Sequence, residues 1–388
     1  MKKKCTLIFF MVVLTGAVRL AAQPGTWMQK KSLYNLVSGR KYAVAFSLYG
    51  KGYIGTGYSY GFGYDGASNN DLWQYDTLHN AWTQMASMPV VGRQSATAFV
   101  VHGKAYITGG DGANGIVLKD LWEYDPLKNT WKRKADMPNT GLNAAHAFAL
   151  HGKGYVGFGL DSVGYFQKGI WCYDPPADTW TRKKDFPAAT VGESFALSND
   201  SIAIAGLGVV TATGRSAGDI WLYDANADTW TQKNNFKGQP RFGEASFTAN
   251  NTFYIIGGEN NNYRFVTDGW KYDIAHDTWT STGDFPGQPR GGAVSFVIGR
   301  NAYIGTGYDA TSNDKTLGDL WELDTKSLQW KERASLGGGP RDLAVSFGMN
   351  KLGIVATGED GTRFKKDVWA YNALLNDWKK LPDLSYGK

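Results

Sequence analysis

Arginine recurs at one position of a repeated pattern, just ahead of short segments of small and apolar residues. Its five members are Arg40, Arg93, Arg241, Arg290 and Arg341. A guanidinium group offers two parallel hydrogen bonds to a carboxylate. A ring of such groups would bind carboxylates or acidic sugars, or would pair with acidic residues of the protein itself. Leu142 and approximately Ala189 occupy this position in the two remaining repeats.

The residue that follows the next apolar segment separates these arginines into two groups. Three units carry an acidic residue there, which we expect to pair with the arginine of its own unit: Asp111 with Arg93, Glu259 with Arg241, and Glu359 with Arg341. Arg40 and Arg290 face Tyr58 and Tyr308 instead. The sequence therefore predicts that Arg40 and Arg290, with these two tyrosines, are available to a ligand.

A histidine and two carboxylates form the candidate catalytic set: His146, Glu193 and Glu244. His146 and Glu193 stand where the other repeats have valine, threonine or alanine. Glu244 lies one position earlier, where alanine or glycine is usual. A histidine and a carboxylate on neighbouring inner strands would form a hydrogen-bonded acid/base pair. The alternative is that these groups line a channel and bind water.

Pairs of tryptophans nine residues apart reveal the elements that must position these side chains. The first members recur every 48 to 51 residues: Trp73, Trp122, Trp171, Trp221, Trp270, Trp321 and Trp369. Their partners are Trp82, Trp131, Trp180, Trp230, Trp279, Trp330 and Trp378. A period near fifty is typical of a repeat architecture built from one supersecondary unit. We predict seven units in one closed domain, with the indole rings packed between neighbouring units.

One unit, residues 93–131, predicts four short antiparallel strands separated by turn sequences. Strand A is Ala96 to Val101, and strand B runs from Ala105 to Thr108, where two glycines stop it. Strand C is "DLWEYD", and strand D carries Trp131. Four strands repeated around an axis describe the blade of a β-propeller.

Strand B ending in glycines, the "DLW-x-YD" strand and the following tryptophan resemble the Kelch repeat, over residues 40 to 378. The resemblance implies an all-β, seven-bladed Kelch-type β-propeller with four antiparallel strands per blade. The expected blades are about 40–84, 93–133, 142–182, 189–232, 241–281, 290–332 and 341–380. The segment 24–33, around Trp27, is similar to a strand D, and we expect it to help close the ring.

Residues 1–22 predict a secretory signal peptide, with three lysines, an apolar run over 7–18 and two alanines. The apolar run is too short to cross a bilayer of roughly 30 Å as a helix. We expect residues 23–388 to be one exported, monomeric domain, periplasmic or secreted, with no transmembrane segment. The 41 Lys and Arg exceed the 35 Asp and Glu by only six, and four of them lie in the predicted signal. Nucleic-acid binding is therefore not expected.

No metal or cofactor is expected. Galactose oxidase shares the propeller that the Kelch resemblance implies, and it needs copper ligands near the axis and a cysteine crosslinked to tyrosine. Here four histidines fall in turns on the face away from the B–C loops: His79, His102, His151 and His276. Cys172, the one cysteine beyond residue 22, has different residues at its position in the other repeats, so we interpret it as a structural thiol.

The B–C loops are long and unlike one another, whereas the A–B and C–D turns are short and uniform. Because binding residues concentrate in loops on a rigid scaffold, we expect a module that binds a protein or a glycan on the B–C/D–A loop face. It should present an aromatic patch: Tyr58, Tyr60, Phe62, Tyr165, Phe166, Tyr263 and Phe265. The alternative is an enzyme acting on acidic sugars. Periplasmic sialic acid epimerases are similar in fold and size, and that similarity implies Arg40 and Arg290 as carboxylate anchors beside the candidate catalytic set.

Overall fold

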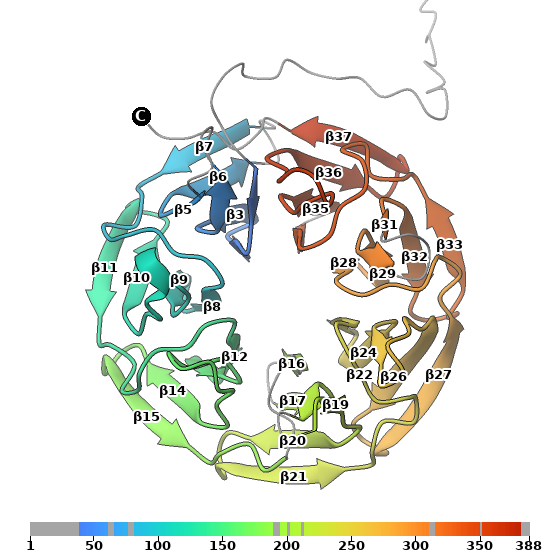
Figure 1. The fold of residues 1–388 in the computed structure, drawn as a ribbon, viewed down its shortest axis with the longest axis horizontal. Coiled ribbons are helices and arrows are strands. Elements are labelled where there is room, and N and C mark those ends of the chain that lie inside the picture. The colour runs from blue at the N-terminus through green and yellow to red at the C-terminus, as the bar shows by residue number, and fades with distance from the viewer. Residues whose placement is uncertain are drawn as a thin grey trace, which may run out of the picture.

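The structure is a computed structural model that describes residues 39–60, 66–76, 81–188, 195–199, 202–210, 213–309, 315–349 and 351–381. Its described residues form seven four-stranded antiparallel sheets arranged around a central axis (Figure 1). In each sheet the strands are bonded in chain order, from the innermost strand A to the outermost strand D. The all-β propeller with four antiparallel strands per blade is therefore confirmed. The predicted signal peptide and the 24–33 segment lie outside the described residues.

The blades are numbered in chain order, and each contains four main strands. Blade 1 has β2 (Val44–Leu48), β3 (Lys51–Gly55), β6 (Leu72–Asp76) and β7 (Ala81–Met85). Blade 2 has β8 (Thr97–Val101), β9 (Lys104–Thr108), β10 (Leu121–Asp125) and β11 (Thr130–Lys134). Blade 3 has β12 (His146–Leu150), β13 (Lys153–Gly157), β14 (Ile170–Asp174) and β15 (Thr179–Lys183).

The remaining blades repeat this arrangement. Blade 4 has β16 (Phe195–Ser198), β17 (Ala203–Gly206), β20 (Ile220–Asp224) and β21 (Thr229–Lys233). Blade 5 has β23 (Ala245–Ala249), β24 (Thr252–Ile256), β26 (Asp268–Asp273) and β27 (Thr278–Asp284). Blade 6 has β28 (Val294–Ile298), β29 (Asn301–Gly305), β32 (Leu320–Asp324) and β33 (Trp330–Arg333). Blade 7 has β34 (Val345–Met349), β35 (Leu352–Ala356), β36 (Val368–Asn372) and β37 (Asp377–Leu381).

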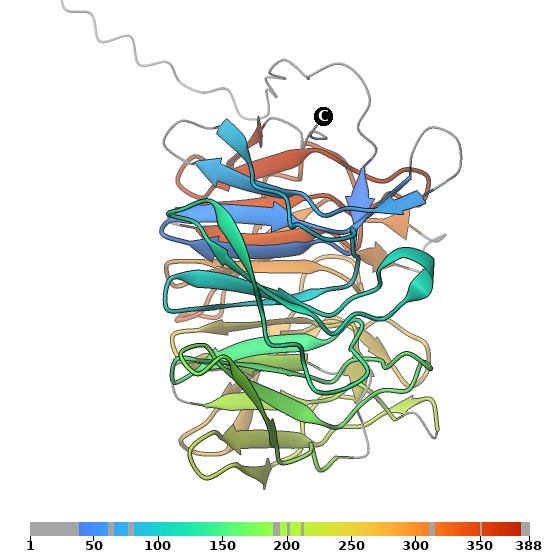
Figure 2. The ribbon, with the colours of Figure 1, turned by 90° about the vertical axis from the view of Figure 1, so that its left-hand side faces the viewer.

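Short hairpins extend the B–C loops beyond the sheets. They use β1 (Arg40–Lys41), β4 (Tyr58–Tyr60) and β5 (Gly66–Ser68) in blade 1, and β18 (Val209–Val210) and β19 (Arg215–Ser216) in blade 4. Blade 5 adds β22 (Arg241–Phe242) and β25 (Glu259–Asn260), and blade 6 adds β30 (Tyr308–Asp309) and β31 (Lys315–Thr316). In blade 2 the loop contains the short 3-10 helix η1 (Ala113–Gly115), which lies at one side of the disc when it is seen edge-on (Figure 2).

The core lies between the blades, where the tryptophans pack. All fourteen paired tryptophans are buried or half-buried. Trp122 of blade 2 lies in one apolar cluster with Phe46 and Tyr53 of blade 1, and Trp369 of blade 7 lies in one with Phe296 of blade 6. Burying an aromatic side chain removes about 150–250 Å² of surface from water. The predicted role of these rings as packing residues is confirmed.

Two sets of hydrogen bonds join neighbouring blades. In five of the seven pairs the second tryptophan donates its indole N–H to a carbonyl of the preceding blade, as Trp131 does to Ala86 (2.6 Å) and Trp180 to Ala135 (2.7 Å). A glycine after strand B donates its N–H to the following blade, where the acceptor is the carbonyl at the arginine position. Gly358, with φ of 92°, donates to Arg40 (2.9 Å) and so joins blade 7 to blade 1. That φ suits glycine, which explains the glycines at the end of strand B.

Within the residues that the structure describes, no helix has the length and apolar character needed to span a bilayer.

Candidate functional site

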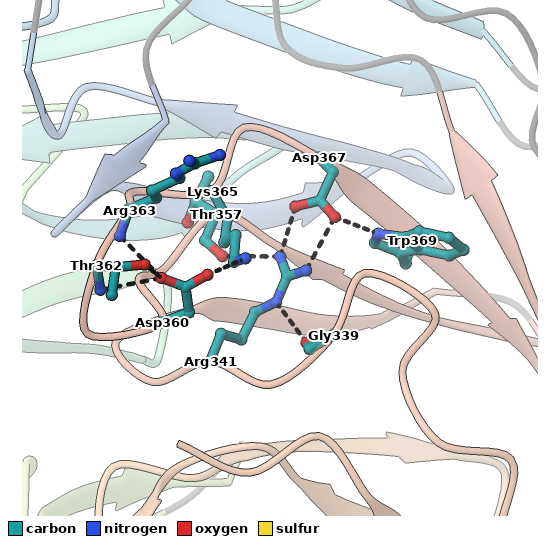
Figure 3. Close-up of polar contacts among 9 residues, drawn as sticks. All are labelled: Gly339, Arg341, Thr357, Asp360, Thr362, Arg363, Lys365, Asp367 and Trp369. Carbon is teal, nitrogen blue, oxygen red and sulfur yellow. Dashed lines mark hydrogen bonds and ion pairs between the residues drawn. The ribbon is translucent and has the colours of Figure 1, made fainter. Parts of the chain in front are cut away.

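All five arginines of the repeated position bind an aspartate two residues before the first tryptophan of the same blade. Both terminal nitrogens donate, giving two parallel hydrogen bonds per pair. The pairs are Arg40–Asp71 (2.6 and 2.8 Å), Arg93–Asp120 (2.8 and 2.8 Å), Arg241–Asp268 (2.7 and 2.8 Å), Arg290–Asp319 (2.5 and 2.7 Å) and Arg341–Asp367 (2.7 and 2.9 Å). The tryptophan then donates its indole N–H to the same carboxylate, as Trp369 does to Asp367 (2.6 Å; Figure 3). We call this unit the Arg–Asp–Trp triad.

The predicted arginine pairing is wrong. Arg93, Arg241 and Arg341 do not use Asp111, Glu259 and Glu359 as their bidentate partners, and the guanidinium groups of Arg40 and Arg290 are not available to a ligand. The five side chains are between 0 and 3% exposed, and a further hydrogen bond runs from each to a backbone carbonyl at the end of strand B. The physical reason is the sheet order. An arginine at the start of strand A reaches past strand B to the start of strand C.

The triad also changes the acidity of its carboxyl group. Burial alone would raise the pKa of Asp120, Asp268, Asp319 and Asp367. The hydrogen bonds and charge of the paired arginine, together with the indole N–H, outweigh burial and hold each pKa below its ordinary value. These aspartates are therefore charged partners of the arginines at neutral pH, and the triad is a structural unit.

Blade 3 lacks the arginine and the aspartate of the triad and keeps only the tryptophan, Trp171. Leu142 replaces the arginine and is buried in an apolar cluster, and Gly169 stands where the aspartate would be. The joint change was visible in the sequence, because Asp precedes the first tryptophan by two residues in six repeats and is missing in the repeat whose arginine is leucine. That coincidence was the signal for the true partner.

The carboxylates predicted as arginine partners lie at the entrance to the innermost strands. The residue after the arginine position bridges the residue after strand B, and we call these the entrance pairs: Lys41–Tyr58, Gln94–Asp111, Asn143–Leu160, Phe242–Glu259, Gly291–Tyr308 and Asp342–Glu359. Tyr58 and Tyr308, the predicted ligand contacts, are members of this set. Among these described residues four side chains are acidic and one, Lys41, is basic.

Contacts between blades join several entrance pairs. Asn143 of blade 3 donates its side-chain amide to Asp111 of blade 2 (2.6 Å), and Lys41 of blade 1 binds Glu359 of blade 7 (3.2 Å). Burial raises the pKa of Asp111. Burial and the neighbouring charge of Glu359 raise the pKa of Asp342. An entrance of this composition favours cationic or neutral groups over anionic ones.

The candidate catalytic set is distributed over different blades. His146 begins β12 of blade 3, is half-buried and lies edge-on to Phe158, with ring centroids 6.4 Å apart. Glu244 is half-buried and precedes β23 of blade 5, so blade 4 stands between the two residues (Figure 1). Glu193 lies outside the described residues. A common acid/base site of these three groups stays a prediction.

The tips of the B–C loops are fixed by side-chain hydrogen bonds to backbone N–H groups. Asp161 accepts from Val163 and Tyr165 in blade 3, and Asn260 accepts from Asn262 and Arg264 in blade 5. In blade 7, Asp360 accepts from Thr362 and Arg363 and binds the Lys365 ammonium group (Figure 3). The tips are therefore ordered turns.

These turns present two of the predicted aromatic residues to solvent. Tyr165 is 67% exposed and Tyr263 is 83% exposed. Phe166, Phe265 and Tyr58 instead pack against the protein, Phe265 edge-on to Tyr308. Of the aromatic side chains predicted to form one exposed patch, two are thus exposed to solvent and three are packed against the protein. Phe62 lies outside the described residues.

Two of three comparisons with known proteins find a match for this chain. A model of the Attractin/LZTR1 β-propeller family matches residues 53–309. The solved structure of YjhT superimposes with a TM-score of 0.59 at 18% sequence identity, covering 76% of this chain and 98% of the YjhT chain. No curated protein sequence matches this chain. Both matches are to Kelch-type propellers, and the structural likeness at this identity concerns the fold.

Proposed function

Because the chain belongs to the Attractin/LZTR1 β-propeller family, we propose that it is a non-catalytic binding module that holds a partner on its B–C/D–A loop face. The partner we favour is a protein, and a glycan is the second possibility that the test below distinguishes. The single observation that supports this proposal most strongly is the set of ordered B–C tips with exposed tyrosines.

The chemistry of the tips fits protein recognition. Tyr165 and Tyr263 supply large amphipathic surfaces, and Arg264 and Arg363, also exposed, are neighbours of these turns. Tyrosine and arginine are enriched among the residues that contribute most to binding energy at interfaces. Because the turns are held by Asp161, Asn260 and Asp360, the side chains are presented with little conformational entropy to lose.

An enzyme acting on acidic sugars receives less support. That alternative assigned the substrate carboxylate to Arg40 and Arg290, whose guanidinium groups are buried and bound to Asp71 and Asp319. The entrance pairs that remain carry mainly acidic side chains, which repel an anionic sugar. The binding module is therefore the better supported of the two functions.

The test is selection of ligands by the loop face. Purified protein is used to pan a phage-displayed random peptide library and to probe a glycan array, alongside a Tyr165→Ala/Tyr263→Ala double variant. We expect peptides selected by the wild type to lose at least about tenfold in affinity for the double variant, which corresponds to about 1.4 kcal/mol.

The matched control is a Leu127→Ala/Leu374→Ala double variant. These leucines are equally exposed, at 80 and 81%, but lie in C–D turns on the other face. The control should bind selected peptides as the wild type does. If peptide binding is retained by the Tyr165→Ala/Tyr263→Ala variant and lost by the Leu127→Ala/Leu374→Ala control, the partner binds the face of the C–D turns. Selection of glycans without peptides would make the partner a glycan.

Export is part of the same proposal and rests on the pattern of residues 1–22. Expression of the full chain with a C-terminal tag should yield a protein that begins near residue 23 and is recovered outside the cytoplasm. An intact N-terminus in the cytoplasmic fraction would contradict it.

A further inference from the structure

Strand C carries a polar residue in four blades at the position paired with the third residue of strand B, and in blades 1, 2 and 6 this residue links several side chains. Gln74 of blade 1 donates to the Tyr53 hydroxyl (2.5 Å) and accepts from Lys51 (3.2 Å). Glu322 of blade 6 accepts from Asn301 (2.9 Å) and Arg333 (2.9 Å). The side chain at this position therefore fills the space between strands B and D near the A–B and C–D turns.

Blade 2 shows the most complete form of this arrangement. The carboxylate of Glu123 accepts a hydrogen bond from the Tyr106 hydroxyl (2.9 Å) and forms an ion pair with Lys104. Lys134, at the end of strand D, places its ammonium nitrogen 4.0 Å from the same carboxylate. Two lysines and one tyrosine thus surround one carboxylate.

Blade 3 repeats the surrounding residues without the carboxylate. Its strand B begins at Lys153 and carries Tyr155, and its strand D ends at Lys183, the positions of Lys104, Tyr106 and Lys134. The position of Glu123 is taken by Cys172, which pairs with Tyr155 across the sheet as Glu123 pairs with Tyr106. The carboxylate that both lysines contact in blade 2 is therefore missing, while the strand D lysine keeps an aspartate of the next blade nearby in both cases, Asp178 for Lys134 (3.3 Å) and Asp228 for Lys183 (3.9 Å).

A cavity of about 270 Å³ occupies this part of blade 3. It lies at the turn face, and blade 4 closes one side. Its lining includes Lys153, Lys183, His151, Cys172 and the hydroxyls of Thr179 and Thr181. Drug-sized ligands occupy pockets of about 300–1,000 Å³, so this space suits a small molecule.

We propose that this cavity binds a small organic carboxylate, whose carboxylate group takes the place that Glu123 occupies in blade 2. Lys183 and Lys153 would supply charge-assisted hydrogen bonds to it, and the hydroxyls of Tyr155 and one threonine would donate to its remaining lone pairs. The rest of the ligand would contact Asn226 of blade 4 and His151, both of which line the cavity.

The charges around the cavity support an anion with two basic contacts. Asp174 also lines the space, and it is engaged by Lys153 (2.8 Å). Lys183 lies 3.9 Å from Asp228, at the limit of an ion pair, so its ammonium group retains hydrogen-bonding capacity. Lys183 is therefore the principal anchor.

Cys172 has a spatial role in this proposal and no nucleophilic one. The side chain is 3% exposed, and burial raises the pKa of its thiol despite a hydrogen bond with the Tyr155 hydroxyl and the charge of the two lysines. The thiol is therefore protonated at neutral pH, and thiolate chemistry is suppressed. Because cysteine is smaller than glutamate, Cys172 leaves open the space that a glutamate side chain would occupy at this position.

The experiment exchanges the residues of the two blades. Acetate, malonate and inorganic phosphate are titrated into the full chain by calorimetry at constant ionic strength. The wild type should bind one carboxylate probe per chain. Cys172→Glu supplies the carboxylate from within and should weaken binding at least about tenfold, since one to two charge-assisted hydrogen bonds are lost to the ligand. Cys172→Ala should bind as the wild type does.

The reverse exchange tests the same idea as a gain of binding. Glu123→Cys should release Lys104 from this carboxylate, leave Lys134 with Asp178 alone (3.3 Å) as Lys183 is left with Asp228, and add a second carboxylate site per chain. Should Cys172→Glu fail to fold by circular dichroism, Lys183→Gln provides the loss-of-binding test at the same site. Acetate and malonate binding that is unchanged in the loss variant, or absent from the wild type, would overturn the proposal. Binding of phosphate alone would replace the carboxylate class by a phosphate.

Discussion

Either charge of a buried Arg–Asp pair is costly to leave without its partner. The Arg–Asp–Trp triad can therefore be tested by substituting one residue at a time. In blade 7 the Arg341 side chain is fully buried, and Asp367 is also bonded by Trp369. Arg341→Met leaves the Asp367 charge without its main partner. We expect the free energy of unfolding to fall by about 3–5 kcal/mol, as measured by urea denaturation.

A surface ion pair of the same chemistry provides the control for this substitution. Arg133 binds Asp136 (3.0 Å) at the rim of blade 2, with both side chains substantially exposed. Arg133→Met should change the free energy of unfolding by less than about 1 kcal/mol. Equal losses in the two variants would show that the triad is no more important than an exposed pair.

The triads also predict how stability depends on pH. Four of their aspartates, Asp120, Asp268, Asp319 and Asp367, have a lower pKa in the folded protein than in the unfolded chain. Their contribution is therefore fully present above the unfolded value, about 3.9, and is lost as the pH falls through the folded values. We expect the free energy of unfolding to decrease steeply below about pH 4, and less steeply in Asp367→Asn. A flat profile in acid would contradict this.

Asp342 should behave in the opposite way. Burial and the charge of Glu359 raise its pKa, so the charged form opposes folding and stability rises as the pH falls toward the ordinary value. Asp342→Asn removes that charge at similar size, and we expect a higher thermal midpoint at neutral pH. Gln94→Glu, which adds a carboxylate at the equivalent entrance position beside Asp111, should lower the midpoint. A lower midpoint in Asp342→Asn would refute the argument.

At this scale the sequence identified the correct arginines and the wrong partners. Asp111, Glu259 and Glu359 were chosen because they follow strand B, close to the arginine in a hairpin. The extended guanidinium reaches one strand further, to the aspartate two residues before Trp122 and its equivalents, where the indole N–H also contributes. Only a comparison among the repeats, with Leu142 and Gly169 changing together, contained that information.

The C–D turns show how one side chain joins two blades. The residue two positions before the second tryptophan has a positive φ, for example 54° at Asp178 and 52° at Asp228. The Asp228 carboxylate accepts from the backbone N–H of Lys184 in the preceding blade (3.1 Å) and from the Tyr223 hydroxyl (2.8 Å). Aspartate and asparagine tolerate this backbone conformation better than other residues with a side chain.

Asp228→Ala removes both hydrogen bonds while keeping the turn. We expect a loss of about 1–3 kcal/mol in the free energy of unfolding, because the hydroxyl of the buried Tyr223 and an N–H lose their acceptor. Blade 6 offers the comparison. Leu323 and Leu328 replace the tyrosine and the aspartate there, and Leu328 also has a positive φ. Leu328→Ala, which removes no such bond, should cost less than about 1 kcal/mol.

Strands were easier to predict than the loops between them. The predicted strands A, B and C of residues 93–131 agree with β8, β9 and β10 within one residue, because alternation and glycines mark their ends, and β11 contains Trp131 as predicted for strand D. The loop tips depend on a single aspartate or asparagine that captures nearby N–H groups. Such local bonds leave no periodic signal, so the exposure of Tyr165 and the packing of Phe265 could not be separated from sequence alone.

For the whole molecule, closure of the ring determines cooperativity. Blade 7 covers Trp73 and Ile54 of blade 1 on one side and Phe296 and Val294 of blade 6 on the other. Ending the chain after residue 332 exposes both surfaces to water. We expect this truncated protein to lose its sharp thermal transition and to associate, as judged by calorimetry and size-exclusion chromatography.

The corresponding control alters blade 7 without opening the ring. Arg363→Ala changes an exposed residue at its B–C tip and should change the free energy of unfolding by no more than about 0.5 kcal/mol, the usual range for surface substitutions. A truncated protein that remains monomeric and melts as sharply as the full chain would show that the other six blades fold as an independent unit.

The architecture at this scale could be predicted because fourteen large aromatic side chains at a fixed spacing must be buried, and a ring of blades buries all of them. The position of a ligand could not. Binding residues occur once each, so the periodicity that reveals the scaffold carries no information about them. The cavity beside Cys172 depends on a side chain that differs from its equivalents and on the packing of blade 4, and the repeat predicts neither.

Repetition of the Arg–Asp–Trp triad gives this protein redundancy. Five copies of the paired arginine persist while blade 3 has Leu142 and Gly169, and the chain still forms its sheet there. A propeller with several triads remains folded when one blade lacks its triad, and the residues of that blade are then less constrained by the triad. Blade 3 also has Cys172 on strand C where blade 2 has the carboxylate of Glu123. New binding sites in this protein are therefore expected in the blades whose residues differ from the repeat pattern.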